Sequence, residues 1–388
     1  MYNNKYIVKN LTPWMVDELT AFSNFVKFDL ILLRKPDEFY AAPLKRIETN
    51  GVNIIITPYS NNLFNKKKLN TALKFLFKNL SRFRSKYNFI IGIKSIIWFL
   101  KLDLKKFSNR SNIHAQFATQ ASILSLLIKD YYKGDPLFSF TFHAYDIYYN
   151  NHWFDLMIDY CHKAFSISEF NINYVIKNYK PSDKIVLSRL GVFRHKINMN
   201  KKKKENFSIG LLSWFVEKKG IIYLLEAMKI IKEKGESSIR LTLAGDGPLK
   251  KTILNYIETN DLQSTVKYKG KLKSSEKDDF FNSLDIFVLP SIKLHNDQDG
   301  IPVVLMEAIA YSLPLISTKI SGIPEICVEN FNGKLIEERN VNDLVQSILE
   351  LSKNENEREK YSINSIKLSE KYDIDSNSKL KVKYLNWI

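Results

Sequence analysis

From about Asn206 onward, short apolar segments alternate with amphipathic helical patterns, and this alternation restricts the fold more than any other feature of the chain. Strands that alternate with helices at this spacing predict a parallel, doubly wound α/β sheet, in which ligands bind at the carboxyl ends of the strands. The predicted strands are 207–213, 240–244, 265–268, 285–289, 315–317 and 333–336, and the predicted helices cover 221–231, 249–257, a segment opened by a capping box at Ser275-x-x-Asp278, a helix through Glu307, and 341–351.

The first half of the chain also has an α/β pattern, although a less regular one. Because 388 residues exceed what one hydrophobic core usually serves, two domains are expected. The polar, patternless segment 196–206 predicts a linker between a first domain, 1–195, and a second, 207–365, with a C-terminal segment, 366–388, behind them. Strands of the first domain are expected at 28–33, 52–57, 111–114, 136–143 and 164–168.

Composition narrows the class of partner. The chain has 58 Lys and Arg against 41 Asp and Glu, a net charge of +17, which predicts an anionic partner: a phosphate-bearing ligand, an anionic membrane face or nucleic acid. Two cysteines, Cys161 and Cys327, are too few for a disulfide framework or a four-ligand zinc site. No apolar run approaches the roughly 20 residues of a membrane span, and no signal-peptide pattern is present. We therefore expect a cytoplasmic protein, either free or peripheral on the inner face of the cell membrane.

The segment Asp299-Gly-Ile-Pro-Val-Val-Leu-Met-Glu307 is the most specific in the chain. A proline suits the first turn of a helix, and the free N–H groups of that turn can bind a phosphate. Glu307, one turn further on, is expected to reach ribose hydroxyls, and Asp299 to face whatever lies beyond the phosphates. On these residues alone, a buried helix with incidental acids is the alternative. The expected phosphate-binding segment is Gly300, Ile301, Pro302, Val303 and Val304.

Further landmarks follow in an order that resembles the retaining family-4 glycosyltransferases, the glycosyl transferases group 1, of the glycosyltransferase-B fold. The family's E-x7-E motif and following alanines correspond to Asp299-x7-Glu307 and Ala308-Ile-Ala310. The segment Ile113-His-Ala-Gln-Phe-Ala118 resembles the branch that builds exopolysaccharide, capsule and colanic acid, and the whole resemblance spans about 111–352. Other matching segments are Glu217-Lys-Lys-Gly220, Ala244-Gly-Asp-Gly-Pro248, Val266-Lys-Tyr-Lys-Gly270, Ile320-Ser-Gly-Ile-Pro-Glu-Ile326, Asn332-Gly333, Thr141-Phe-His-Ala-Tyr-Asp146, Ile167-Ser-Glu169 and Gly191-Val192.

The resemblance implies two Rossmann-like domains that face a cleft, with the C-terminal segment crossing back to the first domain. It implies that Glu307 binds the ribose of a nucleotide-sugar donor, that Asp299 contacts the donor's hexose, and that Lys219 neutralises the leaving diphosphate. His143 is expected to hydrogen-bond the sugar near the reacting carbon, although by itself it would more often be a structural histidine. Lys218 and Gly247 complete the expected donor site, which has no metal and no cofactor besides the donor.

Two positions depart from the family pattern. The family's G-R-L is Ser213-Trp-Phe215 here, so Trp214 replaces an arginine that binds the diphosphate. Such electrostatic help often contributes about 3–4 kcal/mol to catalysis, and either Lys218 compensates or the donor lies differently. The first glutamate of the motif is Asp299, one methylene shorter. Both changes keep open an alternative, namely a catalytically weak nucleotide-sugar-binding or scaffold protein of the same fold.

Two D-x-D triplets resemble the carboxylate pairs that hold a magnesium–diphosphate unit in other glycosyltransferases. They are Asp297-Gln-Asp299 and Asp373-Ile-Asp375. Neither has the nucleotide-binding context of those enzymes, so we interpret both as coincidence. No metal is therefore expected.

The segment 66–110 has thirteen Lys and Arg residues and a single acid, Asp103. A basic amphipathic helix of this kind can lie on an anionic membrane surface. An ordinary surface helix whose apolar side faces the core is the alternative. The apolar stripe consists of Leu69, Ala72, Leu73, Leu76, Leu80 and Phe83, and a second stripe of Lys74, Lys78 and Arg82.

Together these features predict a retaining, metal-independent hexosyltransferase. It is expected to transfer a sugar from a nucleoside-diphosphate-sugar, such as a UDP- or GDP-sugar, to a glycan or lipid-linked acceptor in surface polysaccharide biosynthesis. The nucleotide is expected on the second domain and the acceptor on the first. Nucleic acid is not an expected partner, because no recognition motif accompanies the positive charge.

Overall fold

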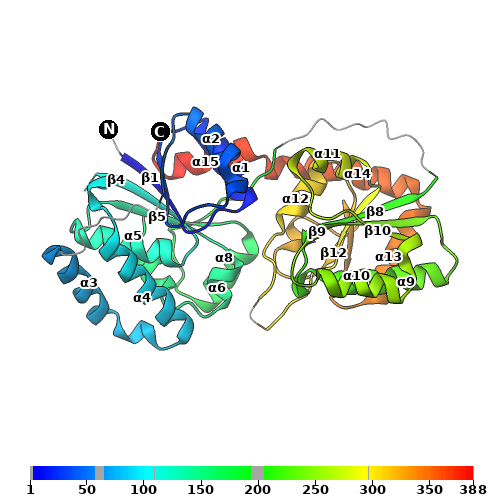
Figure 1. The fold of residues 1–388 in the computed structure, drawn as a ribbon, viewed down its shortest axis with the longest axis horizontal. Helices are drawn as coiled ribbons and strands as arrows, with labels where there is room; N and C mark the ends of the chain where they lie inside the picture. The colour runs from blue at the N-terminus through cyan, green and yellow to red at the C-terminus, as the bar shows by residue number, and fades with distance from the viewer. Residues whose placement is uncertain (1–2, 57–64, 109, 194–204, 296, 388) are drawn as a thin grey trace. The chain divides into compact units, whose positions relative to one another are not determined.

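A computed structural model describes residues 3–56, 65–108, 110–193, 205–295 and 297–387 (Figure 1). The chain forms two compact units, Met1–Leu190 with Ile374–Ile388, and Gly191–Asp373. The expected linker, 196–206, lies almost entirely outside the described residues. Each unit contains one parallel sheet with helices on its faces, so the predicted α/β class with two doubly wound sheets is confirmed.

The first unit has a seven-stranded sheet in the order β3-β2-β1-β4-β5-β6-β7. The predicted strands are all present, whereas β1 and β7 had not been predicted. Its strands are β1 (Asn3–Val8), β2 (Asp29–Leu32), β3 (Asn53–Ile56), β4 (Ser111–Gln116), β5 (Leu137–Phe142), β6 (Lys163–Ser166) and β7 (Ile185–Leu187). Its helices are α1 (Pro13–Ser23), α2 (Ala41–Thr49), α3 (Lys66–Lys78), α4 (Lys86–Lys101), α5 (Gln120–Tyr131), α6 (Ala144–Tyr148), α7 (Phe154–Tyr160), α8 (Glu169–Asn178) and α15 (Ile374–Tyr384).

The second unit has a six-stranded sheet in the order β10-β9-β8-β11-β12-β13. Every predicted strand and helix has a counterpart. Its strands are β8 (Phe207–Trp214), β9 (Ile239–Asp246), β10 (Val266–Tyr268), β11 (Ile286–Leu289), β12 (Leu315–Thr318) and β13 (Gly333–Ile336). Its helices are α9 (Ile221–Glu233), α10 (Lys250–Thr259), α11 (Ser274–Asn282), α12 (Val303–Ala310), α13 (Val341–Lys353) and α14 (Glu355–Ser369).

Two local predictions about helix starts are wrong. The capping box was expected at Ser275 and Asp278, but the N-cap of α11 is Lys273, two residues earlier. Glu276 accepts a hydrogen bond from the backbone N–H of Lys273 at 2.7 Å. Pro302 is the N-cap residue of α12 instead of a member of its first turn. In each case the polar pattern permits more than one register, and the preceding loop determines which residue is the cap.

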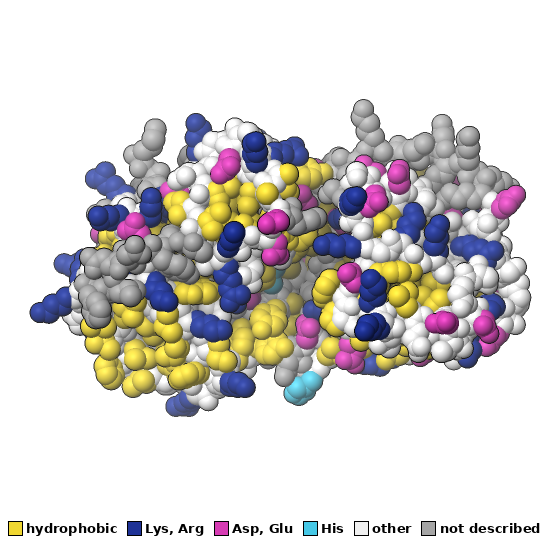
Figure 2. All heavy atoms as spheres, viewed as in Figure 1, with side chains coloured by type: hydrophobic (Ala, Val, Ile, Leu, Met, Phe, Trp, Pro, Cys, Tyr) yellow, Lys and Arg dark blue, Asp and Glu magenta, His cyan; other side chains and the backbone are white. Residues whose placement is uncertain are grey.

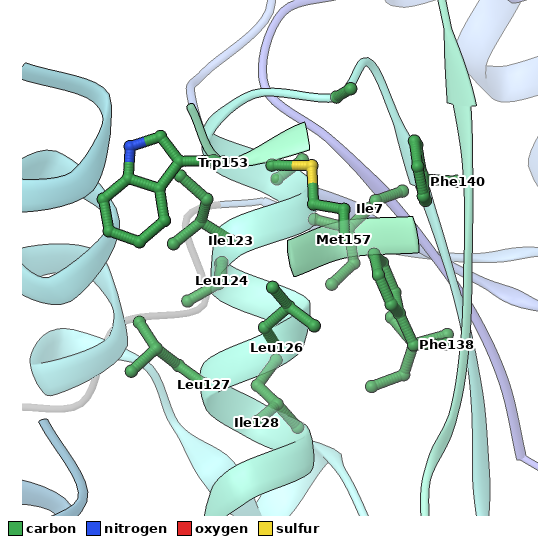
Figure 3. Packing of buried hydrophobic residues seen from close by; sticks show 14 of the residues in the cluster. Ile7, Ile123, Leu124, Leu126, Leu127, Ile128, Phe138, Phe140, Trp153 and Met157 are labelled. Carbon is green, nitrogen blue, oxygen red and sulfur yellow. The ribbon is translucent and has the colours of Figure 1, made fainter. Parts of the chain in front are cut away.

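The core of the first unit surrounds α5, which is buried along most of its length. Figure 3 shows side chains of α5 between Trp153 on one side and the strand that carries Phe138 and Phe140 on the other. Trp153 is fully buried, and its indole N–H donates to the carbonyl of Asn88 in α4 at 3.0 Å. This hydrogen bond holds one side of α4 against the core, and the opposite side of α4 is exposed to solvent.

The C-terminal residues belong to the first unit. Lys381 of α15 is buried and its ammonium lies 2.7 Å from a carboxylate oxygen of Glu18 in α1. Val382, Leu385 and Trp387 enter the same apolar cluster as Phe22. The crossing segment begins at Ile374 in the structure, whereas 366 had been expected, because α14 continues to Ser369 and packs on α12 of the second unit.

Candidate functional site

In the second unit, β8 lies between β9 and β11, so the chain runs outward from β8 in both directions along the sheet. The loops after β8 and β11 therefore diverge at the carboxyl end of the sheet, where doubly wound proteins bind their ligands. The loop after β8 carries Lys218 and Lys219, and the loop after β11 carries Ser291 and Asp299. Several residues that the sequence identified as site candidates thus meet at this point.

Gly220 brings these two loops together. Its φ of +64° is left-handed, and a Cβ at this position would lie 1.8 Å from the carbonyl oxygen of Pro290. The backbone N–H of Ile292 donates to the carbonyl of Lys218 at 2.8 Å. Only a glycine permits this approach, and the approach places the two lysines beside the acidic loop.

Asp299, which is buried, and Lys219, which is half-buried, form an ion pair. The Lys219 ammonium lies 2.8 Å from each carboxylate oxygen of Asp299, and the Ser291 hydroxyl donates to Oδ2 at 2.8 Å. Burial alone would raise the pKa of Asp299, but Lys219, Lys218 and these hydrogen bonds outweigh it and hold the pKa below its usual value. Asp299 is therefore ionised at neutral pH, although its side chain is almost out of solvent.

Lys218 and Trp214 occupy the rim of the same site. The Lys218 ammonium lies 2.8 Å from Asp297 and 3.8 Å from Asp299. Trp214, the last residue of β8, is 58% exposed, so its ring is not part of the core. Because each aspartate of the first D-x-D triplet faces a lysine, the carboxylates serve ion pairs. In the second triplet Asp373 and Asp375 belong to different units, and the described residues contain no group of three metal-ligating side chains.

The helix α12 begins beside this ion pair. The first N–H groups of a helix lack intrahelical acceptors, so those of Val303 and Val304 are available to an anion. Pro302 has no N–H to offer, and Ile301 is buried. The carbonyl of Gly300 accepts from the N–H of Gly322 at 3.1 Å, which fixes the entry to the helix.

Glu307 is half-buried on α12 and forms an ion pair with Lys277 of α11 at 2.6 Å. Gly247 has a φ of +149°, and a Cβ there would lie 2.6 Å from the backbone nitrogen of Phe215. Its own N–H donates to Asp246 at 2.9 Å. The structure therefore assigns Gly247 a role in closing the loop after β9 against the loop after β8.

In the first unit, His143 follows β5 and is buried against Trp14 and Phe117, with ring centroids 5.2 and 4.5 Å away. The Gln116 side-chain oxygen accepts from the Tyr6 hydroxyl at 2.8 Å, so its amide nitrogen faces Nε2 of His143 at 3.0 Å. Burial, with a smaller contribution from Lys381, lowers the pKa of His143 to about 3, so the ring is neutral.

Asp146 contacts the backbone of His143. Its Oδ2 accepts from the backbone N–H groups of His143 and Ala118 at 2.9 and 3.0 Å. Its Oδ1 is buried with no hydrogen-bond partner in the described part of the chain. Burial raises the pKa of Asp146 to about 7, although the two backbone hydrogen bonds and Lys9 act in the opposite direction.

Sequence reasoning missed Ser291 and Lys277, which contact the two predicted acids, and it assigned no role to Asp146. A serine two residues after a strand and a lysine in a polar helix carry no distinctive pattern. Only the fold reveals that they face Asp299 and Glu307.

Comparison with known proteins agrees with this architecture. Residues 192–368 match the family "Glycosyl transferases group 1". The amylovoran biosynthesis glycosyltransferase AmsK of Erwinia amylovora is 35% identical over 178 residues, which cover 45% of this chain and 44% of AmsK. The chain thus matches less than half the length of this curated relative.

Solved structures match over nearly the full length. A glycosyltransferase from Rickettsia africae has a TM-score of 0.70 at 17% identity and covers 99% of this chain and 98% of its own. Anabaena HepE, solved in complex with UDP and glucose, has a TM-score of 0.71 at 13% identity and covers 100% of both chains. The protein has the two-sheet fold of the glycosyltransferase-B class. Its second unit matches the glycosyl transferases group 1 family, and the resemblance inferred from the sequence is confirmed.

Proposed function

We propose that the protein is a retaining, metal-independent glycosyltransferase that moves a sugar from a nucleoside-diphosphate-sugar to a glycan or lipid-linked acceptor. The observation that carries this proposal is the ion pair of Lys219 and ionised Asp299, held at the carboxyl end of the sheet beside the first turn of α12. This arrangement offers a diphosphate a mobile cation and helix N–H groups, and offers a sugar a fixed acceptor of hydrogen bonds.

The residues have separate roles in this proposal. Lys219 exchanges Asp299 for the donor's diphosphate and stabilises the charge that grows there as the donor bond breaks. Asp299, freed from the lysine but still hydrogen-bonded to Ser291, accepts hydrogen bonds from the hexose hydroxyls. Glu307 exchanges Lys277 for the ribose hydroxyls. The first turn of α12 and the loops at Lys218 and Gly247 enclose the phosphates.

The chemical step is a substitution at the anomeric carbon. The bond from this carbon to the diphosphate breaks, and the acceptor oxygen bonds to the same face. The acceptor's proton passes to a diphosphate oxygen, so the protein need not supply a base. His143 suits the role of hydrogen-bond partner to the transferred sugar, because its ring is neutral and one of its two nitrogens carries a proton.

The names of relatives support a place in surface polysaccharide synthesis. AmsK is described as an amylovoran biosynthesis enzyme, and a matching Staphylococcus aureus protein as a capsular polysaccharide biosynthesis glycosyltransferase. We extend this to the present chain as a proposal, with a lipid-linked acceptor at the inner face of the cell membrane. A catalytically weak nucleotide-sugar-binding protein is the second candidate, and exposed Trp214 in place of a cation favours it.

The test is a panel of UDP-, GDP-, ADP- and CMP-sugars, measured as thermal stabilisation and as nucleotide release. One nucleotide should stabilise the protein. Glu307→Ala should weaken the binding of that nucleotide by about 1.5–3 kcal/mol, roughly ten- to a hundredfold in Kd, because the ribose loses a charged acceptor. Glu258→Ala, an exposed glutamate of α10, is the matched control. Stabilisation without release would favour the second candidate. No response to any nucleotide would contradict both.

A further inference from the structure

The outward side of α3 is an uncovered apolar stripe. Leu69, Leu73, Phe77 and, in the turn that follows, Leu80 are spaced by four, four and three residues, so they share one side of the helix. Their exposed fractions run from 42% to 67%, and Phe77 is the most exposed. The inward side of the same helix is already packed, because Phe75 stacks on buried Trp153 with parallel rings 5.9 Å apart. The outer stripe is therefore not needed for the core.

The next helix, α4, repeats this arrangement. Its inward residues include buried Ile91 and Phe99, whereas Phe89, Ile90 and Ile97 are 37% to 51% exposed. Exposed lysines at 86, 94 and 101 alternate with them along the helix. Of the eighteen exposed large hydrophobic residues in the described part of the chain, seven thus lie on these two helices and their connecting turn. We call these seven side chains, with the lysines between them, the outer face.

The structure corrects the sequence-based stripe at 69–83. The segment is not one continuous helix, because α3 ends at Lys78 and a 3-10 turn spans Leu80–Phe83. Ala72 is buried and Leu76 and Phe83 are half-buried, whereas Leu69, Leu73 and Leu80 are exposed. One side of the helix packs on the core, as the surface-helix interpretation expects, and a second apolar side remains exposed. The membrane interpretation stays a prediction.

The charge around the outer face has one sign. Residues 66–101 contain ten Lys and Arg and neither Asp nor Glu. One of the ten, Lys68, is buried and donates to the carbonyls of Leu100 and Leu102 at 2.7 Å, so its role is structural. Figure 2 shows hydrophobic side chains gathered over the region of α3 and α4, with Lys and Arg among and around them.

The combination of exposed apolar side chains and positive charge indicates which kind of partner the outer face can bind. A second copy of the chain would bring its own lysines against these lysines, and like charges at a contact oppose association. Of the described helices, none combines the length and apolar character that a membrane crossing requires. An anionic lipid surface satisfies both features, because acyl chains accept the apolar side chains while the phosphate headgroups accept the lysines.

We propose that the outer face docks on an anionic phospholipid membrane. Phe77, Leu73 and Phe89 enter the boundary between headgroups and acyl chains, and Lys74 and Lys94 remain among the phosphates, with the helices lying along the surface. The docking itself needs no enzymatic activity. Its purpose, bringing the site to a lipid-linked acceptor, rests on the function proposed above.

The test is flotation of the full chain with vesicles of phosphatidylglycerol and phosphatidylcholine, compared with phosphatidylcholine alone. The chain should float with the anionic vesicles only, and less as salt is raised. The double variant Leu73→Ser/Phe77→Ser should lower partitioning by roughly tenfold or more, since it removes two inserted side chains. The matched control is Ile176→Ser/Ile363→Ser, two residues of α8 and α14 that are 51% and 47% exposed.

Three outcomes would overturn the proposal: no flotation with anionic vesicles, an equal loss in the control variant, or a concentration-dependent dimer that only Leu73→Ser/Phe77→Ser disrupts and that does not bind vesicles. Thermal stabilisation by the nucleotide that the panel identifies is measured on the same variants. Flotation without nucleotide binding would leave the docking intact and contradict the proposed function, and the converse result would contradict the docking alone.

Discussion

The two units share one topology but differ in the polar groups at the carboxyl ends of their sheets. In both, the first strand lies beside the second and the fourth, so the loops diverge at the same relative position. In the second unit this position holds a charged pair, Lys219 and Asp299. In the first unit the strand ends carry a neutral histidine, His143, which lies within hydrogen-bond distance of Gln116. The buried acid Asp146 accepts from the backbone N–H of this histidine. The scaffold is therefore common, and the side chains at the strand ends distinguish what each unit binds.

This difference also explains where family resemblance is strongest. A diphosphate site, as proposed for the second unit, demands glycines at tight turns, a lysine and a helix start at fixed places. These requirements produce motifs that can be recognised in the sequence of that unit. In the proposed function, the acceptor site of the first unit needs only hydrogen bonds to uncharged groups, which many residue types supply. The matched family accordingly covers 192–368, while the outer face of α3 and α4 lies outside it.

The largest effect is expected when a substitution breaks the ion pair of Lys219 and Asp299. Lys219→Ala should lower kcat by roughly 10²–10³, because one electrostatic contact to the growing diphosphate charge is lost, and should change donor affinity less. The measurement is steady-state turnover with the nucleotide-sugar that the panel identifies. The control is Lys251→Ala, an exposed lysine on α10. Turnover that survives the change would mean that the chemistry occurs away from Asp299.

The sequence predicted most of this pair's surroundings, for a physical reason. Gly220 needs a left-handed φ, and helix α12 begins directly after Pro302, so both features leave marks in the local sequence. Ser291 and Lys277 leave none, since a hydroxyl or an ammonium can arrive from any loop that the fold brings near. Strand β1 was missed because its first residues are polar, although Asn4 and Lys5 are buried by neighbouring strands.

Burial produces the features that local sequence could not predict. The pKa of Asp146 depends on the apolar atoms around it, which come from segments far apart in the chain. The exposed stripe on α3 was visible as periodicity, but periodicity cannot tell which side of a helix the core takes. Only the packing of Phe75 on Trp153 decides that the side with Phe77 faces outward.

A smaller effect concerns the buried acid of the first unit. The pKa of Asp146 is about 7 in the folded chain, against an ordinary value near 3.9 when unfolded. Between these values the folded chain holds a proton that the unfolded chain has lost, so the free energy of unfolding falls as pH rises from about 4 to about 7. Asp146→Asn should remove this pH dependence. The change in the free energy of unfolding across this pH range should then be smaller by about 1–3 kcal/mol.

Urea denaturation between about pH 5 and about pH 8 measures this change, with tryptophan fluorescence as the signal. Asp135→Asn, an exposed aspartate of the same unit, should leave the profile as it is in the wild type. The groups near Asp146 that also titrate or carry charge include Lys9, Tyr87, Tyr179 and His143. His143 has a pKa of about 3 and stays neutral over this range. If Asp146→Asn has the same dependence of unfolding free energy on pH as the wild type, the Asp146 carboxyl is ionised in the folded chain throughout this range. Asp146 would then not differ from Asp299.

The smallest expected effect lies at Trp214, where the second unit departs from its family. If Lys218, 2.8 Å from Asp297, supplies the missing positive charge, Trp214→Arg should change kcat by less than about threefold, because the diphosphate already has its cations. Trp214→Gln, which removes the exposed ring and adds no charge, separates loss of the indole from gain of the cation. Both are compared by turnover and by thermal unfolding. A large gain for Trp214→Arg alone, at unchanged stability, would mean that no residue replaces the family's arginine. The wild-type protein would then be the catalytically weak nucleotide-sugar-binding member of the fold.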